Sequence, residues 1–182
     1  MSASRPGSDA DRVWAISMRL DDAELERLAR LEADLLATLH ESADGDETSA
    51  DALRRLFPDA YPDDREAAAE FSALTREDLA DAKADAARRM LAALLAAGND
   101  ETRPRRRHAR HVIPLDEELA QVFLRNLTDL RLLLAERLGI ERDDDPGHPG
   151  QEFRADRQHY QWLGAVQESL VQALYGQLDA SH

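Results

Sequence analysis

The sequence predicts a mainly α protein, a single-domain helical bundle with at most a short two-stranded β ribbon. Alanine and leucine (31 and 27 residues) far outnumber valine and isoleucine (5 and 3), so helix formers dominate and strand formers are scarce. The chain is 43% hydrophobic, which is too much for a wholly disordered protein, and its leucines recur at three- and four-residue spacing. Its 182 residues fit one domain. We expect residues 1–11 to be a disordered tail and residues 12–182 to form the helical domain.

The first elements are a short strand and an amphipathic helix. Residues 12–20 alternate enough to predict a strand, and Asp21 or Asp22 then caps a helix that ends near His40, because a carboxylate accepts from first-turn amides. One leucine stripe marks the buried face of this helix: Leu25, Leu28, Leu31, Leu35 and Leu39.

The middle of the chain predicts three further helices. A short helix begins at Asp51 and stops at Pro58, and another spans residues 65–73. Thr75 followed by Asp78 resembles a capping box and predicts a new helix that ends at Gly98. Its expected apolar face consists of Leu79, Ala82, Ala86, Met90, Leu94 and Ala97.

The last third repeats the order strand, Asp cap, helix. Residues 111–115 predict a second strand that pairs with the first, and Asp116 caps a helix that Gly139 stops in a left-handed conformation. A final helix is expected from residue 155 to 178. The residues expected to be buried on these two helices include Phe123, Leu127, Leu130, Trp162, Val166, Leu170 and Leu174.

Composition excludes several classes of protein. The chain contains no cysteine, so disulfides, thiolate zinc sites and thiol redox switches are excluded. The polar N-terminal residues predict no secretory signal, and the longest apolar run, Met90–Ala97, is far shorter than the ~20 residues that span a bilayer. We therefore expect a cytoplasmic protein without membrane contact. Its net charge of −14 repels phosphate backbones and attracts basic proteins.

Motifs for catalysis or cofactor binding are weak. Asp156 and His159 give one imperfect match to the Glu-x-x-His pattern of di-iron bundles, and His108 and His111 read as solvated loop residues among arginines. The chain has no nucleophile elbow and no glycine-rich phosphate loop. Ala135 and Gly139 have helix-turn-helix spacing, but the acidic, proline-containing segment that follows cannot be a recognition helix. We expect no enzyme, no cofactor and no metal.

One basic cluster is the candidate nucleic-acid-binding site. It comprises Arg103, Arg105, Arg106, Arg107 and Arg110. The arginine fork suits phosphate and guanine edges. The alternative interpretation is a solvated loop that neutralises acidic neighbours of the same fold.

Three segments together resemble the AosR-like family of actinobacteria: LFPDAYPDDREAAAEFSALTREDLADAK, LDEELAQVFLRNLTDLRLLLAERLGI and YQWLGAVQESLVQAL. That family was long catalogued as a domain of unknown function, and its genes often lie near that of the protease adaptor ClpS. The resemblance implies a transcriptional regulator of the oxidative-stress response that acts on promoters with a stress sigma factor. Because cysteine is absent, any oxidant response here must use Met18, Met90 or a partner.

Two functional hypotheses follow. The first is a non-enzymatic cytoplasmic regulator of transcription that binds promoter DNA together with a sigma factor. The alternative is an acidic helical adaptor that docks a basic protein and never contacts DNA. Either hypothesis is compatible with a homodimer.

Overall fold

The computed structural model describes residues 16–43, 55–57, 65–100, 110–142 and 145–179. The described residues form two strands and four helices, which confirms the mainly α prediction. In chain order the elements are β1 (Ile16–Leu20), α1 (Asp22–Ala43), α3 (Arg65–Gly98), β2 (His111–Leu115), α4 (Glu117–Leu138) and α5 (Arg154–Asp179). The expected tail at residues 1–11 lies outside this part of the chain.

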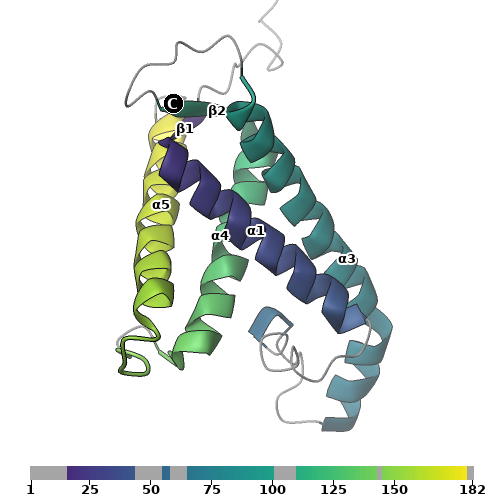
Figure 1. Ribbon diagram of the computed structural model, residues 1–182. Coiled ribbons are helices and arrows are strands. Elements are labelled where there is room, and N and C mark those ends of the chain that lie inside the picture. The colour runs from purple at the N-terminus through teal and green to yellow at the C-terminus, as the bar shows by residue number, and fades with distance from the viewer. Residues whose placement is uncertain (1–15, 44–54, 58–64, 101–109, 143–144, 180–182) are drawn as a thin grey trace, which may run out of the picture.

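The helices spread away from a small sheet at one end of the molecule (Figure 1). Helix α1 runs diagonally across the front, α3 and α5 flank it on opposite sides, and α4 lies behind it. Helix α1 packs mainly on α3, and α4 packs mainly on α5. The sheet lies beside the start of α1 and α4 and the end of α3, so it joins elements that are far apart in the sequence.

The two strands pair antiparallel as predicted, with Ile16 opposite Leu115 and Leu20 opposite His111. Burial alternates along β2: His111, Ile113 and Leu115 are buried, whereas the residues between them are exposed. This alternation is typical of a strand with one face on the core. Residues 12–15 of the predicted first strand lie outside the described residues.

Local hydrogen bonds define the helix ends. Asp21 accepts from the Glu24 amide at 2.8 Å, and the Glu24 carboxylate accepts from the Asp21 amide at 2.9 Å, so α1 begins with a reciprocal capping box. Asp116 caps α4 by accepting from the Leu119 amide at 2.7 Å. Gly139 ends α4 at φ 64°, where a Cβ would meet the His148 ring at 2.4 Å. The next helix, α5, begins only at residue 154, so a helix-turn-helix at this point is ruled out.

The expected break at Thr75 is wrong. Helix α3 is continuous over 34 residues, where two helices, 65–73 and one from Thr75 to Gly98, were expected. No glycine or proline interrupts residues 65–97, and alanine is abundant there, so the backbone stays helical past Thr75 and Asp78. Of the short helix expected from Asp51, the structure describes residues 55–57, of which 55 and 56 are helical.

The core lies where the four helices meet beneath the sheet. Its fully buried large side chains include Leu28, Leu35, Met90, Leu94, Ile113, Phe123, Leu127 and Leu163. The stripes expected on α1 and α4 are largely confirmed, although Leu25 is only partly buried.

The stripes expected on α3 and α5 need correction. On α3 the expected Leu79 is 47% exposed and Ala82 is exposed, whereas Ala84 and Ala87 are buried. Alanine occurs on every face of this helix, so it could not define the buried one. On α5, Leu163 is fully buried, whereas Trp162 is only half-buried. Val166 and Leu174 are likewise only partly buried and pack at the margin of the core.

Truncation of Leu130 tests this core. Leu130 is 2% exposed, so Leu130→Ala should lower the free energy of unfolding by about 2–5 kcal/mol, because it removes buried methyl groups and leaves a cavity. The measurement is the urea midpoint followed by helical circular dichroism. Leu95→Ala is the control, since Leu95 is 53% exposed on α3 and should change stability little. Equal midpoints for the two variants would contradict the packing described.

Candidate protein-binding site

An apolar groove of about 410 Å³ runs between β1 and α5. All five residues of β1 line one side of it. The other side is one face of α5: Trp162, Ala165, Val166, Ser169, Leu170 and Ala173. Glu24 of α1 and Arg110, just before β2, complete the lining. The face of α5 that was expected to be core is thus core in part, since Leu170 is buried as expected, and also borders the groove.

The groove follows the edge of β1 rather than a face of the sheet. Successive side chains of a strand point to opposite faces, so a surface lined by all five consecutive residues lies along the strand itself. None of the β2 residues 111–115 contributes to the lining. The edge of β1 that does not pair with β2 therefore faces the groove.

Two arginines and one glutamate are the charged residues of the lining, so its net charge is positive by one. Arg19 and Arg110 are exposed, and neither forms an ion pair or hydrogen bond with a described residue. The acid at the groove, Glu24, is already engaged in the capping box with Asp21. In a chain of net charge −14, two unpaired guanidinium groups at one site favour an anionic partner.

The structure places one member of the predicted basic cluster. Arg110 is exposed and lies at the groove. The other four, Arg103, Arg105, Arg106 and Arg107, lie outside the described residues, as does His108. Sequence reasoning missed Arg19, because it is isolated along the chain and joins Arg110 only through the pairing of the strands.

His111 is not the solvated loop residue that was expected. It begins β2, is 8% exposed, and lies between Ala97 of α3 and Asp22 of α1. Its Nδ1 is 2.9 Å from the Ala97 carbonyl oxygen and its Nε2 is 2.6 Å from the Asp22 carboxylate. The ring bridges a backbone carbonyl of α3 and a carboxylate of α1. His111 thus links the sheet to α1 and α3.

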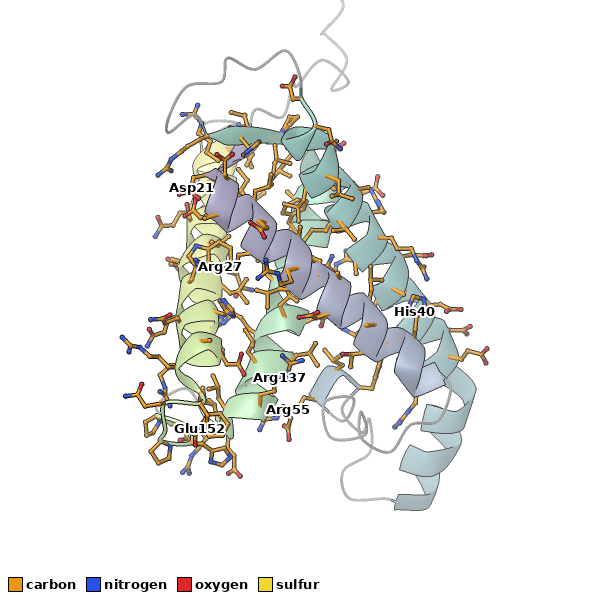
Figure 2. All side chains as sticks on the ribbon, viewed as in Figure 1. Asp21, Arg27, His40, Arg55, Arg137 and Glu152 are labelled. Atoms are coloured by element: carbon orange, nitrogen blue, oxygen red, sulfur yellow. The ribbon has the colours of Figure 1, made fainter. Side chains whose placement is uncertain are left out.

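Arg27 supports the wall of the groove. Its guanidinium lies 5.0 Å from the centre of the Trp162 ring, and Figure 2 shows Arg27 between α1 and α5. Arg131 of α4 acts similarly nearer the core, donating to Gln167 at 2.8 Å and stacking over Tyr160. These contacts join α5 to α1 and α4.

A second feature is a pair of acids between the helices, away from the groove. Glu32 of α1 is fully buried, and no described residue donates to either of its carboxylate oxygens. Burial raises its pKa to about 8, and the nearby charge of Asp129 adds to the effect. Glu32 is therefore largely protonated at pH 7.

Asp129 differs from Glu32 because it has a cationic partner. Lys83 of α3 donates to its carboxylate at 2.6 Å. Burial still raises the pKa of Asp129, although the hydrogen bond and the charge of Lys83 oppose the shift. Asn126, one turn earlier on α4, is fully buried, and no described residue pairs with its amide group.

The sequence contained a signal for this buried polar group. Glu32 lies four residues after Leu28 and three before Leu35, on the leucine stripe of α1. Asn126 follows Phe123 by three residues and precedes Leu130 by four, which places it on the stripe of α4. Position on an apolar stripe, rather than residue type, indicates the burial.

The motif formed by Asp156 and His159 does not belong to a metal site in the part of the chain that the structure describes. No group of three or more His, Asp or Glu side chains there is arranged to hold a metal ion. Desolvation and the charges of Arg27 and Arg30 lower the pKa of His159, while Asp156 opposes the shift. None of the helices in the described ranges is long and apolar enough to cross a membrane.

These observations define a mainly helical protein whose described surface carries an apolar groove along an unpaired strand edge. The chain belongs to the family of the domain of unknown function DUF2017, whose model matches residues 1–174. No curated protein and no solved structure matches the chain.

Glu32 makes stability depend on pH. Its pKa is 4.5 when unfolded and about 8 when folded, so between these values the unfolded state releases the proton and the folded state keeps it. The free energy of unfolding should therefore fall as pH rises from about 5 to 8, with a contribution near 1.4 kcal/mol per pH unit. Glu32→Gln should remove that contribution, measured by urea unfolding at a series of pH values.

Asp34→Asn is the matched control for this experiment, because Asp34 is exposed on the same helix. Its pH dependence should follow that of the wild type. If the Glu32→Gln and wild-type curves run parallel from pH 5 to 8, Glu32 ionises in the folded protein and the assignment is wrong.

Proposed function

We propose that the protein is a non-enzymatic cytoplasmic regulator of transcription that acts by binding another protein at the groove between β1 and α5. The observation that carries the proposal is the groove itself, an apolar surface next to a strand edge and two arginines that pair with no described residue. Apolar surface rimmed by polar groups is typical of protein-binding sites. The resemblance to the AosR-like family supports transcription as the process and a stress sigma factor as the partner.

Direct DNA contact is the second candidate. Arg110, the last member of the basic cluster, is exposed and lies at the same groove as Arg19, so positive charge extends beyond the cluster itself. The net charge of −14 opposes DNA at long range, which favours an arrangement where the sigma factor supplies sequence specificity.

A transcription assay with purified components tests the regulator. RNA polymerase, a stress sigma factor and its promoter are mixed with increasing amounts of the protein, and transcript yield is measured. We expect a saturable change in yield, and a matching complex with the sigma factor by calorimetry. No complex and no change in yield would contradict the proposal.

The DNA contact is tested with the same promoter as a labelled duplex. Replacement of Arg105, Arg106, Arg107 and Arg110 by Ala should remove most of the salt dependence of binding, because each phosphate contact contributes a slope near −0.9. Arg125→Ala is the control, since Arg125 is exposed on α4 away from the groove. If wild type binds the sigma factor but never the duplex, the adaptor hypothesis takes the place of direct DNA contact.

Of the two methionines that the structure describes, Met18 is the better placed for an oxidant to reach. Met90 is 0% exposed in the core, whereas Met18 is partly exposed and lines the groove. Hydrogen peroxide should therefore convert Met18 to the sulfoxide well before Met90, as measured by peptide mass spectrometry. The chain contains no cysteine, so a dithiothreitol-reversible change in the purified protein, or equal oxidation of the two residues, would contradict this expectation.

A further inference from the structure

We propose that the groove binds an extended acidic peptide segment of the partner, which adds to β1 as a third antiparallel or parallel strand. The inference rests on the proposed function and names how the partner is held and which chemistry it presents.

The unpaired edge of β1 supplies the backbone contacts. Among the described strands, β1 pairs with β2 alone, so its outer N–H and C=O groups have no strand partner there. Strand β1 contains no proline, and each of its five residues keeps an amide donor, whereas β2 contains Pro114. Strand addition to a free edge is a common way to bind extended peptides.

Helix α5 supplies the side-chain contacts. An added strand beside β1 would direct alternate side chains toward Trp162, Val166 and Leu170, which lie on one face of α5. Five residues of strand span about 17 Å, so the segment that fits is short. Alternating apolar residues in the peptide match this wall.

Arg19 and Arg110 supply the charge preference. Arg19 lies next to Leu20, and Arg110 precedes His111, the residue that pairs with Leu20. Both guanidinium groups therefore lie at the same end of β1. A carboxylate at the corresponding end of the peptide would meet two arginines that form no ion pair with a described residue.

The same features argue against double-stranded DNA in this groove. Its walls are mostly apolar, and its length is that of one short strand. Phosphate contacts would use the two arginines but leave the apolar face of α5 and the strand edge unused. An extended acidic peptide would contact the two arginines, the apolar face of α5 and the strand edge.

The test follows Trp162 fluorescence in the full-length Trp14→Phe protein, where Trp162 is the remaining tryptophan. The probes are a panel of peptides about eight residues long in which Val, Ile, Leu or Phe alternates with Thr, with two Glu at one end. Matched panels carry two Lys in place of Glu, or a central Pro that removes a backbone donor.

We expect the Glu peptides to shift the emission and to bind at least tenfold more tightly than the Lys and Pro peptides. Arg19→Ala together with Arg110→Ala should abolish the preference for Glu, whereas Arg125→Ala should leave it intact. Equal binding of Glu and Lys peptides, or no binding by any panel, would overturn the inference.

Ala165→Glu blocks the groove with little risk to folding, because Ala165 is an exposed helical residue that lines it. It should weaken peptide binding at least tenfold, while Ala155→Glu, exposed on α5 outside the groove, should not. Circular dichroism confirms that both variants fold. A promoter duplex that displaces the peptide, or a dimer that Ala165→Glu dissociates, would assign the groove to another occupant and overturn the inference.

The sigma factor titration separates this inference from the proposed function. If wild type and Ala165→Glu bind the sigma factor equally, the groove inference is wrong and the proposed function stands. If the Glu peptides bind as expected but the sigma factor does not, the groove inference stands and the named partner is wrong.

Discussion

The pairing of residues 16–20 with residues 111–115 closes the helical bundle at one end, and the other features of the molecule depend on it. The pairing brings the start of α1 next to the start of β2 and the end of α3, although Leu20 and His111 lie ninety-one positions apart in the chain. His111 reinforces the closure by contacting Asp22 of α1 and the last turns of α3 through Ala97. The same pairing sets the position of β1 beside α5 and brings Arg19 close to Arg110, so the groove is a consequence of the sheet.

A core made of leucine and alanine shapes the rest of the bundle. Small alanine side chains on α3 let its backbone approach α1 and α4, and Ala84 and Ala87 are buried at these contacts. The chain is only 5% aromatic, so few large rings fill the interior, and Phe123 is the aromatic side chain that is fully buried among the described residues. Burial of Glu32 in this interior is unfavourable to the charged carboxylate, and the raised pKa is the direct result.

Charge is distributed unevenly between the groove and the rest of the surface. Several described arginines pair with acids, as Arg89 does with Glu118 and Arg55 does with Glu136 near the end of α4 (Figure 2). Arg19 and Arg110 form no ion pair with a described residue, which is equally true of Arg125, Arg137, Arg142 and Arg154, but of these six arginines only Arg19 and Arg110 line the apolar groove. Unpaired cations on an acidic protein gain most from an anionic ligand, because no internal pair has to be broken. A partner segment that is extended, apolar and acidic meets each of these conditions.

Element types and ends were largely predictable from the sequence because they depend on local interactions. Helix propensity, the Asp21 and Asp116 caps and the Gly139 stop each involve residues within one turn of one another. The local signal at Thr75 gave a wrong prediction, because the capping pattern there lies inside a continuous helix. The four arginines at positions 103 and 105–107 lie outside the described residues, so their predicted role stays a prediction.

The buried face of α3, the half-buried position of Trp162 and the groove were decided by the tertiary structure. Because alanine occurs on every side of α3, the sequence does not indicate which face of the helix is buried. The packing of α1 and α4 against α3 decides it. The stripe of Trp162, Val166 and Leu170 has the spacing of a core face, and Leu170 is buried as expected, but β1 leaves a gap beside Trp162 and Val166, and that gap is the groove. Arg19 and Arg110 are ninety-one positions apart and meet only because strand pairing is a long-range contact. The sequence by itself determined which elements form, since propensity and capping act within a turn, and the tertiary structure decided which of their faces remain open to a partner.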